Sequence, residues 1–266
     1  MNEAATQVID EDGWKSYDEF ADGIDSFRLP QSDRSGQHLE FVLDSGETLA
    51  VDFLDAQTAQ WSAALELLSD SQGKAEYDAV QVRSEAYFLN LKLDGSSLTV
   101  AYSTATGRAV LVESLIAETE SPGVPRVRQH FQAARLQGVQ ASGEQPAESR
   151  DLIGLRNIYR YSPSHLYEHV YISSERYAWQ CLEGVQRGHG DMDLATVWKL
   201  AEGLYVFCFR EFRIPVASVW LHDLGYQLKT TGIFLGLNGS GEVEHSRGGG
   251  DIYPLGSVRY PDAQPI

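Results

Sequence analysis

The sequence has little cysteine and no long apolar run. The two cysteines among its 266 residues, Cys181 and Cys208, lack the Cys-x-x-Cys spacing of a redox or zinc motif. Both lie in apolar surroundings, which favours reduced, packed thiols over a disulfide. No apolar stretch approaches the ~20 residues that cross a bilayer, and the first residues lack the basic start and apolar core of a signal peptide. We therefore expect a cytoplasmic protein without a membrane partner.

Basic residues are also scarce. The chain has 21 Lys and Arg against 38 Asp and Glu, a formal net charge of −17. Residues 1–150 hold 25 acidic and 11 basic residues, whereas residues 151–266 hold 13 and 10. A field of this sign repels phosphate backbones, so nucleic acid is not an expected partner. The first 25 residues carry eight carboxylates against Lys15, which is typical of a solvated tail, with an acidic docking arm as the alternative.

Helical periodicity is rare, and from His38 the apolar residues recur with period two. A short helix is expected near Asp18–Ile24, and Ala56–Ser69 reads either as a helix or as a long excursion between strands. The expected strands cover residues 39–43, 48–53, 77–83, 86–93, 97–103, 108–116, 126–139, 155–161, 167–172, 176–182, 196–200, 205–212, 217–221 and 232–237. Many short strands with almost no helix between them predict an all-β protein of antiparallel sandwiches or barrels.

The composition changes once along the chain. Residues 141–150 are small and polar and include Pro146, as in a linker. The linker would separate an N-terminal domain, residues 36–140, from a C-terminal domain, residues 151–266, and residues 1–35 would form a separate acidic segment.

The two halves resemble each other. Val42–Ala50 aligns without gaps on Val170–Ala178, and later residues match at a drifting offset: Ala86–Phe88 falls near Leu204–Val206, and Ser97-Leu98 near Ser218-Val219. We therefore predict two tandem antiparallel β-barrels derived from an internal duplication.

The second half resembles a known family. Tyr161–Gly184, Leu200–Glu211 and Thr231–Gly236 resemble the C-terminal domain of the MoaF family, and the first half resembles its N-terminal domain less distinctively. The resemblance implies lipocalin-like domains. The family name points to molybdenum-cofactor biosynthesis but carries no particular reaction.

A more distant resemblance is to the phenolic acid decarboxylases, small barrels that cleave hydroxycinnamic acids without a cofactor. Tyr159-Arg160-Tyr161 looks like their Tyr-x-Tyr pair, and Glu211 after Phe209 looks like their catalytic Glu. Their essential Arg corresponds to Gln180, which follows Trp179. This departure removes a cation, so recognition of a carboxylate is not carried over.

The string His165-Leu-Tyr-Glu168-His169 matches the HxxEH pattern of a zinc peptidase class, which needs both histidines on one helix face. The surrounding residues predict a strand instead, where positions i and i+4 stand roughly 13 Å apart. Side chains at that separation cannot share one zinc ion. No metal site is expected.

Strand alternation assigns faces to the remaining candidates. Tyr167, His169 and Tyr171 share one face, and Phe207, Phe209 and Glu211 share another with Tyr205 and Arg213. An aromatic face that ends in a carboxylate is typical of a barrel lumen that binds an aromatic ligand. Alternatively, Glu211 pairs with an arginine at the rim, and the tyrosines and tryptophans are ordinary strand or core residues.

Other motifs point away from chemistry. The glycine clusters 236–241 and 248–250 precede no helix, so neither is expected to hold a phosphate. His189 and His222 lie in loop-like contexts, and we expect them to be exposed.

Two functional hypotheses follow. In the first, the C-terminal barrel is an acid/base enzyme without cofactor, of lyase, isomerase or cyclase type, that acts on a small hydrophobic, aromatic or phenolic molecule. Its expected catalytic residues are Glu211, Tyr159, Tyr161 and His169, and its expected ligand contacts are Tyr167, Tyr171, Trp179, Gln180, Phe207 and Phe209. In the second, both barrels are non-catalytic carriers of lipocalin type. A homodimer paired through edge strands stays open.

Overall fold

The computed structural model describes residues 13–261, 263 and 265, and it is almost entirely β. Its single α-helix, α1, spans Tyr17–Ala21. In the described residues no helix is long and apolar enough to cross a membrane. The all-β prediction is confirmed.

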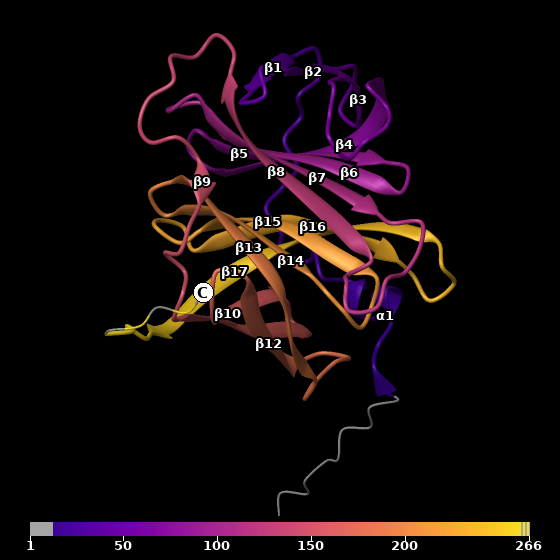
Figure 1. The fold of residues 1–266 in the computed structure, drawn as a ribbon, viewed down its shortest axis with the longest axis vertical. Helices are drawn as coiled ribbons and strands as arrows, with labels where there is room; N and C mark the ends of the chain where they lie inside the picture. Colours follow the sequence, from indigo (N-terminus) through magenta and orange to yellow (C-terminus); the bar gives the residue numbers. More distant parts are fainter. Residues whose placement is uncertain (1–12, 262, 264, 266) are drawn as a thin grey trace, which may run out of the picture.

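The first barrel is closed and has eight antiparallel strands in chain order, with β1 pairing with β8. The strands are β1 (His38–Leu43), β2 (Thr48–Phe53), β3 (Thr58–Ser62), β4 (Gln72–Arg83), β5 (Ala86–Leu93), β6 (Ser96–Ser103), β7 (Arg108–Ile116) and β8 (Val127–Leu136). Figure 1 shows this barrel as the upper layer.

The second barrel has the same order and forms the lower layer of Figure 1. Pairing of β10 with β17 and of β12 with β13 closes it, and the short β9 adds to the edge of β13. The strands are β9 (Ala147–Glu148), β10 (Leu155–Ser162), β11 (His165–Tyr171), β12 (Arg176–Glu183), β13 (Gly190–Ala201), β14 (Leu204–Arg210), β15 (Val216–Asp223), β16 (Lys229–Leu237) and β17 (Val243–Ser257). Two tandem barrels are thus confirmed.

One part of the repeat alignment is wrong. Val42–Ala50 spans the turn between β1 and β2, whereas Val170–Ala178 spans the turn between β11 and β12. Strand order makes β11 the counterpart of β2, so the aligned hairpins are one strand out of step. The later matches do join counterparts, because β5 corresponds to β14 and β6 to β15. Two hairpins with similar turns and alternation are hard to tell apart by sequence.

A helix at Ala56–Ser69 is wrong as well. Residues Thr58–Ser62 form β3, with Ala59 and Trp61 buried and Gln60 and Ser62 exposed, and an irregular loop follows. The buried carboxylate of Glu113 holds that loop, because it accepts hydrogen bonds from the backbone N–H of Glu66 at 3.3 Å and of Leu67 at 2.7 Å. Tertiary contacts thus decide the conformation of a segment whose local pattern was ambiguous.

The two barrels differ in how their lumens are filled. Aliphatic and aromatic side chains fill the N-terminal lumen, among them Phe41, Leu49, Val51, Trp61 and Leu98. A further apolar cluster joins the outer faces of the two barrels, with Val80, Phe88 and Val110 from the first and Val206, Val219 and Ile233 from the second. The N-terminal lumen is thus lined by apolar side chains, whereas a histidine and a carboxyl border the C-terminal lumen, which makes the C-terminal lumen the candidate site.

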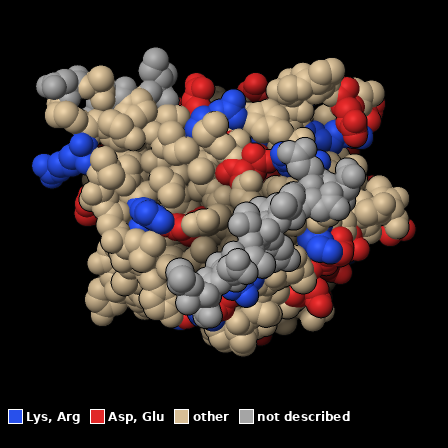
Figure 2. All heavy atoms as spheres, turned by 90° about the horizontal axis from the view of Figure 1, so that it is seen from below, with Lys and Arg blue, Asp and Glu red and all other residues tan. Residues whose placement is uncertain are grey.

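The N-terminal segment packs against both barrels, so a solvated tail is wrong for residues 13–25; residues 1–12 of that tail lie outside the described part. Trp14, Tyr17, Phe20 and Ile24 pack on the core of the C-terminal barrel, and α1 lies beside that barrel in Figure 1. Their spacing of three to four residues makes one apolar face on an otherwise acidic segment. On the molecular face shown in Figure 2, basic side chains are interspersed with acidic ones.

Candidate functional site

A small internal cavity lies in the lumen of the C-terminal barrel. Its volume is about 30 Å³. Its wall is mostly aromatic and consists of Phe20, Ile24, Tyr161, Tyr167, His169, Tyr177, Trp179, Gln186, Phe209, Glu211, Trp220 and Phe234. Within the part of the chain that the structure describes, this lining includes no lysine or arginine. The chemistry of this lining therefore suits an uncharged aromatic group, although the space left between the side chains is smaller than an aromatic ring.

Glu211 is the ionisable carboxyl of this cavity. It follows the end of β14, where its backbone N–H donates to the Val216 carbonyl at 2.9 Å, and its side chain faces the lumen. Among the described residues, no ion pair involves Glu211, and Arg213 pairs with Asp191 at 2.8 Å instead. Burial, followed by the charges of Asp193 and Asp191, raises the pKa of Glu211 well above its ordinary value. The raised pKa favours the protonated carboxyl, which is the form that can serve as a general acid.

Asp193 is a second buried carboxyl beside this site, on β13. It accepts a hydrogen bond from the indole N–H of Trp179 at 2.9 Å and one from the backbone N–H of Phe212 at 3.3 Å. Burial raises its pKa to about 6. The two carboxyls thus differ in role, because Asp193 is bound by fixed donors while Glu211 faces the cavity.

The two tyrosines of the Tyr-x-Tyr pair lie at different depths. Tyr161 lines the cavity, and no hydrogen bond of its hydroxyl to protein is found within residues 13–261. Tyr159 is fully buried farther in, where its hydroxyl is 2.6 Å from that of Tyr171 and 3.3 Å from the donating amide of Asn157. Tyr161 therefore has a hydroxyl free for a ligand, and Tyr159 does not.

His169 borders the cavity from β11. Burial lowers its pKa to about 3, so the ring is neutral at pH 7. Its ring centre lies 4.4 Å from that of Tyr159, and its buried Nδ1 has no partner among the described residues. A neutral imidazole with a free nitrogen can accept or donate a hydrogen bond to a bound molecule.

Five of the six expected ligand contacts lie in the lumen, and three of these five reach the cavity. Tyr167, Trp179 and Phe209 line the cavity, and the Tyr167 hydroxyl donates to Gln186 at 2.9 Å. Tyr171 and Phe207 are buried in the same aromatic core, with ring centres 5.2 Å apart, but do not reach the cavity.

Gln180 is a correction. It is exposed on the outer face of β12, where its amide donates to Glu168 beside Arg156. Tyr177, Trp179 and Cys181 take the inward positions of that strand, so alternation places Gln180 outside.

Sequence reasoning missed several residues of this lumen. His222, expected in the solvent, is fully buried, and its Nδ1 lies 2.8 Å from the Thr230 hydroxyl. Alternation along β15 could have found it, because Trp220 and His222 share a face. Tyr177 was recoverable in the same way, but Asp193 was not, because the expected strand began at residue 196.

The two histidines of the HxxEH string have different surroundings: His169 borders the cavity, and His165 does not. Both lie on strand β11, and the His165 ring is held between the Ser162 hydroxyl at 2.7 Å and the Phe20 carbonyl at 3.1 Å. No group of three or more potential metal ligands occurs among the described residues.

Two solved structures have a weak likeness to this chain. A protein of Burkholderia vietnamiensis with the provisional description of a β-lactamase matches with a TM-score of 0.35 and 14% identity, over 41% of this chain and 100% of its own. The β chain of DNA polymerase III from Streptococcus pneumoniae matches with a TM-score of 0.14 and 8% identity, over 88% of this chain and 82% of its own. Neither similarity carries an argument about fold or function.

Sequence comparisons are decisive. The model of the MoaF N-terminal domain matches residues 12–118, and that of the MoaF C-terminal domain matches residues 146–258. Protein MoaF of Klebsiella aerogenes is 32% identical over 220 residues, which cover 77% of this chain and 79% of that protein. Two barrels in the same order, each matched by the corresponding domain model, show that the chain belongs to the MoaF family.

Proposed function

We propose that the C-terminal barrel is a cofactor-independent acid/base enzyme for a small, uncharged aromatic or phenolic molecule. The observation that carries the proposal is the Glu211 carboxyl, which faces an aromatic cavity with its pKa raised and no cation beside it among the described residues. A carrier needs only an apolar lumen, and a buried carboxyl without a partner costs free energy that a carrier has no reason to retain.

The chemistry that this arrangement supports is proton transfer. Protonated Glu211 would donate to a carbon or oxygen of the bound molecule, which permits an isomerisation, a cyclisation or an elimination. Tyr161 would hold a substrate oxygen through its free hydroxyl, and His169 would be a second neutral hydrogen-bonding group at the inner wall. The rings of Trp179 and Phe209 would hold the substrate in place.

The lining also limits the substrate class. The position that carries an arginine in the phenolic acid decarboxylases is Gln180, which lies outside the barrel. A carboxylate in this lumen would lack a counterion, so neutral phenols and aromatic carbonyl compounds are the expected class.

The test is Glu211→Gln, which keeps the shape of the side chain and removes its proton. Candidate neutral phenols and aromatic ketones are incubated with the protein in deuterium oxide, and NMR measures turnover and deuterium incorporation. A positioned acid contributes about 10²–10⁴-fold, so the variant should be at least a hundredfold slower with similar ligand affinity. Glu175→Gln, an exposed glutamate of the same barrel, is the matched control. Binding without any turnover by the native protein would establish the carrier instead.

A further inference from the structure

The mouth of the C-terminal lumen is covered by the N-terminal segment, residues 14–24. Tyr17, Phe20 and Ile24 are 2%, 4% and 2% exposed, and the last two line the cavity. The Phe20 ring stands edge-on to Phe234 with ring centres 5.4 Å apart, and Trp14 packs against Trp179 at 5.8 Å. The segment therefore supplies apolar side chains where a ligand would sit.

The remaining space is too small for an aromatic ring. About 30 Å³ holds one or two water molecules, whereas ligand pockets measure roughly 300–1,000 Å³. Continuous strand pairing closes the sides of the barrel. At the end of the barrel that residues 14–24 cover, a ligand can enter only if this segment moves.

Few polar contacts hold this segment on the barrel. The Tyr17 hydroxyl donates to the Phe234 carbonyl at 3.2 Å, the Gly239 N–H donates to Asp18 at 3.2 Å, and the Phe20 carbonyl accepts from His165. With five residues, α1 is too short to be stable without these tertiary contacts. Separation from the barrel thus breaks side-chain packing and single hydrogen bonds, but no strand ladder.

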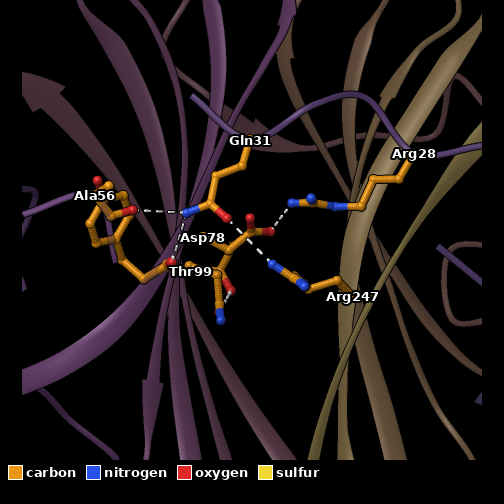
Figure 3. Close-up of polar contacts among 8 residues, drawn as sticks. Arg28, Gln31, Ala56, Asp78, Thr99 and Arg247 are labelled. Carbon is orange, nitrogen blue, oxygen red and sulfur yellow. Dashed lines mark hydrogen bonds and ion pairs between the residues drawn. The ribbon is translucent and has the colours of Figure 1, made fainter. Parts of the chain in front are cut away.

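The chain just beyond this segment is anchored between the barrels. Arg28 forms an ion pair with Asp78 of the first barrel, and both side chains are buried. Gln31 donates to the Ala56 carbonyl and accepts from Arg247 of the second barrel, as Figure 3 shows. Gly23, at φ +76°, lies between the anchor and α1 in a conformation that glycine adopts readily.

From this arrangement we propose that residues 14–24 form a lid, anchored at Arg28 and Gln31, that leaves the mouth of the C-terminal lumen to admit an aromatic ligand. The proposal deepens the proposed function and rests on it for the identity of the ligand class. Phe20 indicates the size of the group that replaces it, about one six-membered ring.

The structure supplies a way to lock the lid. A Cβ built on Gly239 lies 3.7 Å from the Ser16 Cβ, which is within the range of disulfide-bonded cysteines. The double variant Ser16→Cys/Gly239→Cys should form a disulfide that ties the lid to the loop after β16. The native Cys181 and Cys208 are buried, which disfavours mispairing.

Binding of 4-fluorophenol, a neutral phenol, is then followed by ¹⁹F NMR in the oxidised and reduced states. We expect the oxidised variant to bind at least tenfold more slowly or not at all, and the reduced variant to bind like the native protein. Ser16→Cys alone, in both states, is the matched control. Equal binding rates with and without the disulfide would overturn the lid.

Hydrogen exchange tests the lid without a ligand. The amides of Phe20 and Ile24 should exchange at least a hundredfold faster than those of the neighbouring strand β16 in the native protein. Exchange as slow as that of β16 would show a fixed plug and would also overturn the lid. Fast lid exchange with no 4-fluorophenol binding by the reduced variant would leave the lid standing and count against the proposed function.

Discussion

The indole N–H of Trp179 donates a hydrogen bond to the carboxylate of Asp193 at 2.9 Å inside the C-terminal barrel. The two residues come from neighbouring strands, since Trp179 pairs with Asp191 in the β12–β13 ladder. Trp179 is a wall of the cavity, and Asp193 is one of the charges that raise the pKa of Glu211. The hydrogen bond therefore links the position of Trp179 in the cavity wall to the carboxyl group that helps to set the pKa of Glu211.

Replacement of Glu211 by Gln should stabilise the protein at neutral and alkaline pH. The pKa of Glu211 is raised in the folded state, so the unfolded chain releases this proton first as pH rises above its ordinary value of 4.5. As the pH rises from the pKa of the unfolded chain to that of the folded protein, the free energy of unfolding of the native protein falls. The total loss is about 1.4 kcal/mol for each pH unit between these two pKa values. Gln does not titrate, so this part of the pH dependence should vanish.

Urea unfolding between pH 4 and pH 9 measures the effect. The free energies of unfolding of the native protein and the variant should converge near pH 4 and diverge in favour of the variant above it. A variant that is less stable than the native protein at pH 8 would show that Glu211 is a structural ion-pair partner, and the site would be misassigned.

Replacement of Asp193 by Asn should lower the pKa of Glu211. The variant removes a neighbouring negative charge, and with it one cause of the raised value. Infrared spectroscopy follows the C=O stretch of the protonated Glu211 carboxyl, and the band should disappear at lower pH than in the native protein. The same band, absent in Glu211→Gln, assigns the signal. A midpoint that stays in place or rises would contradict the coupling.

The two tyrosines of the Tyr-x-Tyr pair should respond in opposite ways to loss of the hydroxyl. Tyr161→Phe should weaken binding of 4-fluorophenol by about 3–10-fold, the effect of one hydrogen bond, and leave stability nearly unchanged. Tyr159→Phe should leave affinity nearly unchanged but lower stability by about 1–3 kcal/mol, because the buried Tyr171 hydroxyl and Asn157 amide lose their partner. Titration calorimetry measures the affinity for 4-fluorophenol, and thermal unfolding measures the stability of each variant. If Tyr159→Phe proves the more damaging to binding, Tyr161 is not the ligand contact.

The sequence predicts most of the barrels because strand alternation is a local signal. The faces of β11 and β14 follow from period two, so the sequence groups Tyr167 with His169 and Phe209 with Glu211. Long-range packing leaves no such signal. The sequence does not predict β17 because the glycines at 248–250 lower strand propensity. Their reason is a close approach that no local pattern shows: the Trp220 indole lies against Gly248, and backbone atoms of other strands lie against Gly249 and Gly250. The sequence does not predict the lid, because its many carboxylates are typical of a solvated tail. The spacing of Trp14, Tyr17, Phe20 and Ile24 is the signal that indicates a packed face.

The glycines around Trp220 give the last prediction. A Cβ on Gly248 would lie 2.7 Å from Cη2 of this indole, and a Cβ on Gly232 would lie 2.6 Å from its Cδ2. Trp220 is 1% exposed, lines the cavity and is stacked on Tyr161 with ring centres 5.2 Å apart. Both glycines thus leave room for a tightly packed ring whose free side faces the small cavity.

Gly248→Ala should therefore destabilise the protein by about 1–3 kcal/mol, as overpacking does in a full core, and press Trp220 toward Tyr161. Thermal unfolding measures the first effect, and the near-ultraviolet circular dichroism of the tryptophans reports the second. Affinity for 4-fluorophenol should fall, because the shifted indole narrows the cavity. Gly239→Ala is the control, since the nearest atoms to its Cβ are 3.7 Å away, an ordinary contact distance. Native stability with an unchanged tryptophan spectrum in Gly248→Ala would mean that the glycine does not determine the position of Trp220.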